Sequence, residues 1–256
     1  MYPVVLSCGQ AVRHRSGSRT VAYTRRVIKA ELHAHTDADP ADLIAHSVET
    51  LVERAADDGY GALAVTLHDR YFDPAPHADH ARARGLLLLA GIERTIARRH
   101  VLLINFPADC ARVRSFEDVA ALKRTYPSGL VIAPHAFYPT TTALGTLVER
   151  HAELFDAVEV NAMYTTWLDF NRRAIEWARA RGKPLVGSSD LHLLDQMGTT
   201  YSLVDAADDA DADAICDAIR NGRVEVRSSP LPSLTAMTLF TRMCWSGVKG
   251  RLRPRA

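Results

Sequence analysis

The sequence has 256 residues, of which 47% are hydrophobic, and its 31 basic and 30 acidic side chains give a formal net charge of +1. A chain of this length and composition can bury a full core, and it is most simply one α/β domain. The balanced charge produces no overall field that would favour an anionic partner. We therefore expect no stable binding of duplex nucleic acid.

Membrane insertion and disulfide bonding are not indicated. No stretch approaches the roughly 18 consecutive apolar residues of a membrane-spanning helix, and Met1 to Gln10 lacks the features of a signal peptide. The cysteines lie far apart without C-x-x-C spacing, at Cys8, Cys110, Cys216 and Cys244. This spacing argues against a disulfide framework and a thiolate zinc site. We expect a soluble, cytoplasmic protein with reduced thiols; homo-oligomerisation stays open.

The chain divides into three expected segments. Residues 1–26 are polar, basic and poorly defined, residues 27–229 carry the regular α/β pattern, and residues 230–256 form an amphipathic and then basic C-terminal extension. The extension predicts either a helix that packs on the domain or on a second subunit, or attachment to a membrane surface. The sequence does not decide between them.

Apolar strand-like runs alternate with helical patterns through the central segment. After a first strand leading into residues 31–36, we expect strands at 62–66, 86–93, 101–106, 130–133, 157–161, 185–188, 199–204 and 224–226. We expect helices at about 42–57, 115–126, 144–154, 167–181 and 210–221. A basic, hairpin-like turn at 94–99 separates the third and fourth of these strands.

Histidine occurs twice at the end of the first strand, in the run Glu31-Leu32-His33-Ala34-His35-Thr36. Because strand side chains alternate, His33 and His35 share a face and can hold one metal ion. Further residues capable of metal chemistry follow the later strands. Together the set is His33, His35, His68, Glu93, His135, Asp190 and His192. The carboxyl ends of parallel strands assemble one functional face, so we expect these side chains to converge there.

The ordered motifs resemble the polymerase and histidinol phosphatase (PHP) family. They are His33-x-His35, Thr66-x-His68-Asp69, Gly91-x-Glu93, His100, Pro134-His135, Glu159-Val160-Asn161 and Gly187-Ser188-Ser189-Asp190-x-His192. The resemblance covers residues 27–222. It implies a distorted seven-stranded (β/α)7 TIM-like barrel with two or three divalent metal ions, manganese, zinc or iron, at the carboxyl ends of the strands.

The resemblance also implies the metal ligands. The first metal would take His33, His35, Glu93 and Asp190; the second would share Glu93 and add His100 and His135. The third would take His68, His192 and an acidic residue after the first motif, for which Asp39 is preferred over Asp37. Leu67 stands where the family usually has a polar residue, which would weaken the third site. Glu159 and Asn161 would support the rim or order a neighbouring ligand.

The implied activity is a metal-dependent phosphoesterase that cleaves a small phosphorylated metabolite or nucleotide by a metal-bridging hydroxide. Asp190 would orient the nucleophile, and His192 or a metal-bound water would protonate the leaving group. Arginines that follow the strand ends could clamp a substrate phosphate, or be solvated. They are Arg70, Arg94 and Arg98.

Two alternatives remain at this stage. Related barrels hydrolyse amides, but they usually carry a carboxylated lysine, and no strand-end lysine is present here. A non-catalytic PHP-like regulatory or interaction module is the second alternative, although such a module has no use for buried histidines that converge on one point.

Overall fold

The computed structural model describes residues 25–251, which form ten strands and seven α-helices. The strands are β1 (Arg25–Ala34), β2 (Ala62–Val65), β3 (Leu87–Leu89), β4 (Gly91–Ile96), β5 (Arg99–Ile104), β6 (Leu130–Ala133), β7 (Ala157–Asn161), β8 (Leu185–Ser188), β9 (Thr200–Ala207) and β10 (Val224–Ser228). The α-helices are α1 (Val48–Asp57), α2 (Ala78–Arg82), α3 (Phe116–Thr125), α4 (Leu147–Arg150), α5 (Asn171–Ala180), α6 (Ala212–Arg220) and α7 (Ser233–Arg251). Short 3-10 turns are η1 (Ala75–His77), η2 (Ala108–Arg112), η3 (Ala152–Leu154) and η4 (Leu194–Gln196). The extension expected over residues 1–26 lies almost entirely outside the described residues.

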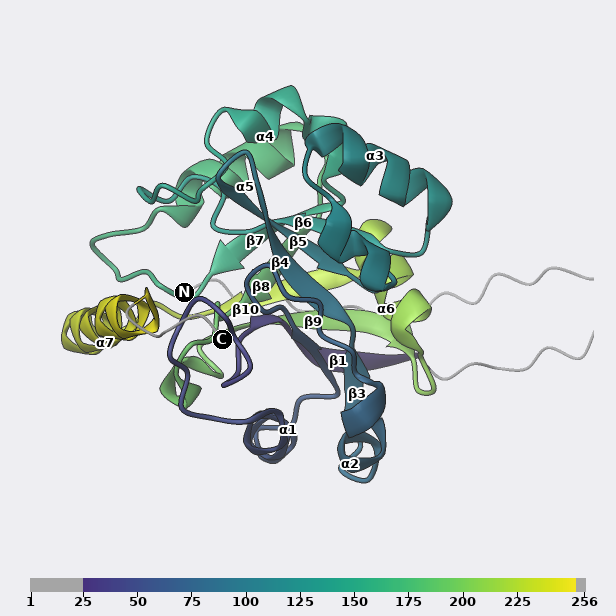
Figure 1. The fold of residues 1–256 in the computed structure, drawn as a ribbon, viewed down its shortest axis with the longest axis horizontal. Coiled ribbons are helices and arrows are strands. Elements are labelled where there is room, and N and C mark those ends of the chain that lie inside the picture. The colour runs from purple at the N-terminus through teal and green to yellow at the C-terminus, as the bar shows by residue number, and fades with distance from the viewer. Residues whose placement is uncertain (1–24, 252–256) are drawn as a thin grey trace, which may run out of the picture.

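The strands form two mixed sheets of five strands each. Their orders are β10-β9-β1-β2-β3 and β4-β5-β6-β7-β8. Helices α1 and α2 lie beside the first sheet, and α3, α4 and α5 lie beside the second, as the lower and upper layers of Figure 1 show. Within the described chain, isolated bridges join the sheets or their connecting loops at Ala34–Leu191, His68–Glu93 and Phe72–Gly91.

The expected closed seven-stranded barrel is therefore wrong. A parallel barrel needs a crossover helix after each strand, but β4 and β5 are joined only by Ala97 and Arg98 and pair antiparallel. Strand β9 also runs antiparallel to β1, and β10 antiparallel to β9. The hairpin-like turn that the sequence predicts between the third and fourth strands is present, and it is what interrupts the β/α alternation.

Local sequence explains the helices that support the sheets. Helix α1 begins after Ser47, whose hydroxyl accepts the Thr50 N–H, and it buries Val48, Leu51, Val52 and Ala55. Helix α3 begins with a capping box between Ser115 and Asp118. Helix α1 starts six residues later than its expected start at Asp42, which leaves Asp42 in the preceding loop.

Two glycines mark close approaches of the backbone. A Cβ at Gly91 would lie 2.6 Å from the Val65 carbonyl oxygen, where the ends of the two sheets meet. A Cβ at Gly187 would lie 2.6 Å from the Tyr201 carbonyl oxygen, where β8 passes β9. Only glycine allows these contacts without displacement.

Among the described residues, no helix is long and apolar enough to cross a membrane. Cys110 and Cys216 are buried and unpaired, as their distant spacing predicts.

Candidate metal centre

A β-bulge at the end of β1 aims the two histidines of the first motif. The parallel register of β1 on β2 shifts between Glu31 and Ala34, so the chain gains one residue at this point. The Glu31 carboxylate accepts the Leu32 and His33 N–H groups at 3.0 Å each. It also accepts the Ser189 N–H at 3.0 Å and the Ser189 hydroxyl at 2.6 Å. Glu31 thus supports the bulge and ties it to the loop after β8.

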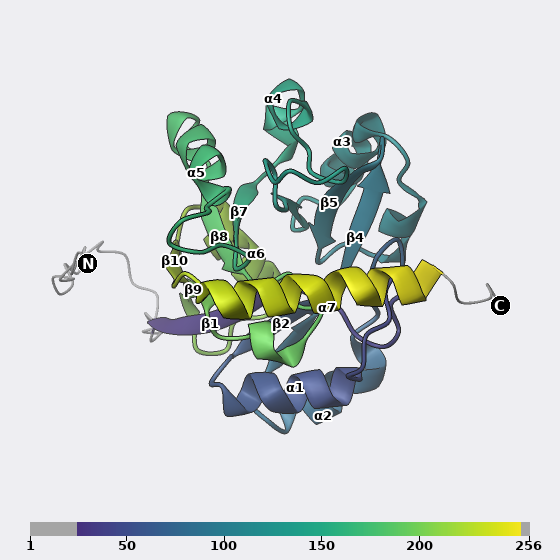
Figure 2. The same cartoon turned by 90° about the vertical axis from the view of Figure 1, so that its left-hand side faces the viewer.

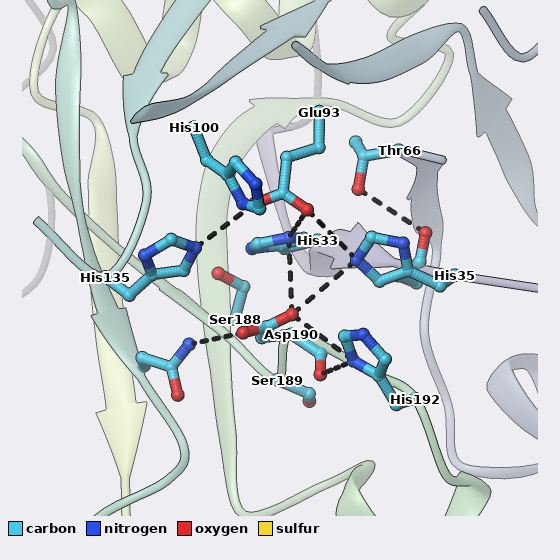
Figure 3. Close-up of polar contacts among 12 residues, drawn as sticks. His33, His35, Thr66, Glu93, His100, His135, Ser188, Ser189, Asp190 and His192 are labelled. Carbon is cyan, nitrogen blue, oxygen red and sulfur yellow. Dashed lines mark hydrogen bonds and ion pairs between the residues drawn. The ribbon is translucent and has the colours of Figure 1, made fainter. Parts of the chain in front are cut away.

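Four side chains converge beyond the bulge (Figure 3). His33 Nε2 lies 3.2 Å from Glu93 Oε2 and 3.4 Å from Asp190 Oδ1. His35 Nε2 lies 3.4 Å and 3.6 Å from the same two oxygens. Ligands held about 2.0 to 2.1 Å from a tetrahedral cation lie roughly 3.3 Å apart. The spacing of these four atoms therefore fits one divalent ion.

The hydrogen-bond pattern supports the same fit. Within the described chain, His33 Nε2, His35 Nε2 and Glu93 Oε2 are buried without a hydrogen-bond partner. The two imidazole nitrogens lie 3.2 Å and 3.4 Å from Glu93 Oε2, but none of the three atoms makes a hydrogen bond. Burying such polar atoms unpaired is costly, and a cation would satisfy all of them.

Glu93 presents its second oxygen to another pair of histidines. Glu93 Oε1 lies 2.6 Å from His100 Nδ1 and 3.1 Å from His135 Nε2. Glu93 and His100 come from the β4–β5 hairpin, and His135 follows β6. One carboxylate therefore faces two groups of donors, which is the arrangement that a bridging ligand needs.

A third group surrounds His68 and His192. The His35 ring lies 4.4 Å from each of their ring centroids. Asp42 Oδ2 lies 3.0 Å from His192 Nε2 and 3.9 Å from His68 Nδ1. Asp42 is not predicted as a ligand from the sequence, because it stands at the expected start of a helix. The sequence feature that could have identified it is an acidic residue seven positions after His35.

Asp39 is buried, but it faces the outer nitrogens of the histidines. Its Oδ2 lies 2.9 Å from His35 Nδ1 and 3.0 Å from His68 Nδ1, and it accepts the His68 N–H at 2.9 Å. This geometry orients two imidazoles. Asp37, the other candidate, is exposed.

Glu159 has a similar supporting position. It contacts His33 Nδ1 at 2.8 Å, and it accepts the Ser188 hydroxyl and the His135 N–H at 2.6 Å each. Asn161 Nδ2 donates to Asp190 Oδ2 at 3.4 Å. Both residues order neighbouring candidate ligands, the role that the sequence suggested for them.

Two candidate ligands have left-handed backbone conformations. His135 has φ of 30° and Asp190 has φ of 50°. Side-chain-bearing residues rarely adopt this region, and strain of this kind collects at functional sites. The contacts from Glu159 to the His135 N–H and from Asn161 to Asp190 help to hold both residues in place.

The arginines predicted to bind substrate have different environments. Arg94 donates to Asp69 and to the Val113 carbonyl oxygen. Arg70 donates to the Ala38 carbonyl oxygen at the rim of the loop that carries Asp39. Arg98 lies in the β4–β5 turn, with φ of 65°. Their role in substrate binding stays a prediction.

Charges in the centre are strongly coupled. Burial disfavours the charged form of His33, but Asp190, Glu93 and Glu159 hold its pKa well above the ordinary value. Burial likewise opposes protonation of His68, yet Glu93 and Asp39 raise its pKa to about 10. The pKa of Glu93 is well below its usual range, because His100, His33 and His68 outweigh burial. Without metal, the centre therefore holds protons at neutral pH.

These protons predict how metal stabilisation changes with pH. The raised pKa of His68 stabilises the metal-free fold below about pH 6.5, and this contribution is lost as pH rises through about 10. A cation instead needs neutral imidazoles. Added manganese or zinc should therefore raise the melting temperature more at about pH 8 than at about pH 6. Thermal scans with and without metal measure this difference, and an equal shift at both pH values would contradict the prediction.

Comparisons with known proteins agree with this geometry. A family model described as PHP-associated matches residues 169–224. A DNA polymerase III PolC-type protein of Streptococcus pyogenes is 29% identical over 163 residues, which cover 62% of this chain and 11% of that protein. This chain thus spans about a tenth of that relative's length.

Solved structures share the fold. A two-domain protein from Bacteroides vulgatus, containing a predicted PHP-like metal-dependent phosphoesterase, has a TM-score of 0.61 at 18% identity, covering 91% of this chain and 75% of that one. Endonuclease Q, in complex with a 27-mer duplex that carries an abasic lesion, has a TM-score of 0.53 at 15% identity, covering 84% and 67%. The chain is thus similar to PHP proteins in part of its sequence and in its fold.

The endonuclease complex corrects one expectation. Exclusion of duplex nucleic acid rested on the net charge of +1, but a protein of the same fold holds a DNA duplex with a lesion at its active site. Net charge averages over the whole surface and does not describe the field at one face. Duplex nucleic acid is therefore not excluded.

Proposed function

We propose that this chain is a metal-dependent hydrolase that cleaves phosphate esters at the centre around Glu93. The observation that carries the proposal is the convergence of His33, His35, Glu93 and Asp190 at the spacing of tetrahedral ligands, with buried atoms left unpaired. Its nearest rivals are hydrolysis of amides and a non-catalytic module.

The donor set fits two or three divalent cations, with manganese, zinc and iron as candidates. The first would take His33, His35, Glu93 and Asp190, and the second would take Glu93, His100 and His135. For a third cation we propose Asp42 beside His68 and His192, because Asp39 is engaged with the outer nitrogens of His35 and His68.

When bound, the cations supply Lewis acidity toward the phosphoryl oxygens and lower the pKa of water. The protein positions this chemistry through Asp39, Glu159 and Asn161, which orient candidate ligands. Asp190 is proposed to orient the attacking water. With two cations bound, His192 is proposed to donate a proton to the leaving oxygen, since Asp42 and Asp190 raise its pKa against the effect of burial.

The substrate is proposed to be a small phosphorylated metabolite, a nucleotide or a phosphodiester in nucleic acid. Arg70 is the arginine best placed to contact substrate phosphate, because its side chain is exposed and donates to the Ala38 carbonyl oxygen and not to a carboxylate. The fold alone does not choose among these classes.

Metal content by inductively coupled plasma mass spectrometry is the first test, on protein purified without chelator, beside the variant His33→Ala/Asp190→Ala. We expect two or three equivalents in the native chain and a clear loss in the variant. Hydrolysis is then compared on phosphate monoesters, phosphodiesters, duplex oligonucleotides and amides. Amide cleavage alone would favour the first rival. One equivalent of metal or none, unchanged in the variant and by added metal, would favour the non-catalytic module.

A further inference from the structure

Helix α7 is nearly separate from the rest of the fold. Between Ser233 and Arg242, Leu239 is buried and Ala236 is half-buried, while the other side chains are exposed. Leu234, Met237 and Phe240 are 72%, 62% and 61% exposed. Their spacing of three residues places them along one side of the helix.

Two threonine hydroxyls on this helix are satisfied by the helix backbone. Thr238 donates its hydroxyl to the Leu234 carbonyl oxygen at 2.9 Å, and Thr241 donates to that of Met237 at 2.8 Å. These hydroxyls need no water to complete their hydrogen bonds. Transfer of the surface into a less polar environment is therefore less costly than its threonine content suggests.

A second exposed apolar segment lies next to the start of α7. Trp167 is 91% exposed and Leu168 is 56% exposed, in the loop after β7. Tyr164 in the same loop accepts the Leu231 N–H at 2.9 Å, and its hydroxyl contacts the Ser228 hydroxyl at 2.8 Å. Of the six large hydrophobic side chains exposed in the described chain, all but Val27 lie on α7 or this loop. We name Trp167, Leu168, Leu234, Met237 and Phe240 the α7 surface.

The stretch of sequence that carries α7 is basic. The sequence from Leu231 to Ala256 has five basic residues and no acidic residue; the basic residues are Arg242, Lys249, Arg251, Arg253 and Arg255. Two acidic residues near the surface are paired: Asp195 in η4 lies 3.3 Å from Arg242, and Asp169, next to Leu168, lies 3.7 Å from Arg172. An apolar surface carried by a basic segment matches the interface of an anionic bilayer.

This surface is on the same side as the candidate metal centre. Figure 2 shows α7 running across the front of the molecule, between α1 and α5. Asp195, its ion-pair partner, adjoins Gln196, which accepts the His192 N–H at 2.9 Å. Helix α7 is thus linked to the candidate ligand His192 through the neighbouring residues Asp195 and Gln196.

We propose that the α7 surface binds the headgroup region of an anionic lipid bilayer, with α7 lying in the plane of the membrane. Exposed tryptophan, leucine and phenylalanine side chains bury apolar surface when they enter the acyl boundary of a bilayer, whereas a nucleic-acid backbone offers them little apolar surface to contact. A second copy would bring two all-basic segments together, which repel each other. The proposal does not depend on the reaction at the metal centre.

Co-sedimentation with lipid vesicles tests it, using the full chain and vesicles of phosphatidylcholine alone or mixed with phosphatidylglycerol. We expect binding to the mixed vesicles, weaker binding at high salt, and a blue shift of tryptophan emission that the variant Trp167→Phe reduces. Lys249→Gln/Arg251→Gln should weaken binding about fivefold for each charge removed. Met237→Ser/Phe240→Ser should weaken it further, whereas Val27→Ser, an exposed apolar residue outside the surface, should leave it unchanged.

Three results would overturn the proposal. The first is equal, salt-independent binding to both vesicles, or none to either, by folded protein. The second is a dimer in sedimentation velocity that Met237→Ser/Phe240→Ser dissociates while vesicles bind neither protein. The third is retention on a duplex oligonucleotide that the same variant abolishes without vesicle binding by the native chain.

Discussion

Replacing Glu93 with glutamine is expected to remove metal from both halves of the centre at once. Oε2 of Glu93 faces His33, His35 and His68, and Oε1 faces His100 and His135. An amide keeps the shape but replaces one of the two anionic oxygens with an N–H donor, which cannot bind a cation. Outer partners of metal ligands already contribute about 10- to 100-fold to metal affinity, so this direct ligand should contribute more than about 100-fold.

Metal stoichiometry and competition with a chromogenic chelator measure the effect. Glu176→Gln is the matched control, because Glu176 is exposed on α5. The control should retain native metal content. If Glu93→Gln bound metal as the native chain does, Glu93 would not be a bridging ligand, and the proposed centre would have to be redrawn.

Replacing Glu31 is expected to lower both stability and metal affinity, although Glu31 is not itself a candidate metal ligand. Glu31→Leu would leave the Leu32, His33 and Ser189 N–H groups without their buried acceptor, at about 1 to 3 kcal/mol for each unsatisfied group. Glu31→Gln keeps one oxygen and should cost less. Because the bulge positions His33, metal affinity should also fall less in Glu31→Gln than in Glu31→Leu, where we expect a loss of about 10- to 100-fold.

Urea unfolding of the metal-free proteins and metal affinity of the folded ones separate the two effects. Burial raises the pKa of Glu31 to about 7, although hydrogen bonds from Ser189 and the His33 N–H oppose the shift. Its stabilising contribution is thus fully present below the ordinary pKa of 4.5 and is lost as pH rises from there through about 7, so all variants are compared at one fixed pH. A leucine variant with native metal affinity would show that the bulge does not need Glu31.

The sequence predicts the strand-end residues well and their supporting shell poorly. His33, His35, Glu93 and Asp190 follow apolar runs whose length and composition identify strands, and parallel strand ends converge by geometry. Strand alternation places Glu31 on the face of His33 and His35, but it does not reveal the bulge in which the Glu31 carboxylate accepts backbone N–H groups. Asp42 was missed for a related reason, since the helix after it begins later than the apolar spacing indicates.

Local sequence patterns also do not predict whether the sheets close into a barrel. The alternation of strands and helices predicts a barrel, but whether edges close depends on pairing between residues distant in the chain, such as Ala34 and Leu191. Conversely, the pattern at residues 94–99 predicts the hairpin correctly. That local feature contradicts a regular barrel, because an antiparallel hairpin leaves no room for a crossover helix between its strands.

The seam between the two sheets has a consequence for cooperativity. Buried residues of both sheets pack in one hydrophobic cluster, for example Leu32 and Ala64 of the first sheet with Leu102 and Val186 of the second. The metal donors also come from both sheets: His33 and His35 from β1, and Glu93 and His100 from the β4–β5 hairpin. Cations at the centre would therefore add cross-links between sheets that already share a core, so loss of metal should lower the free energy of unfolding of the whole chain rather than release one sheet alone.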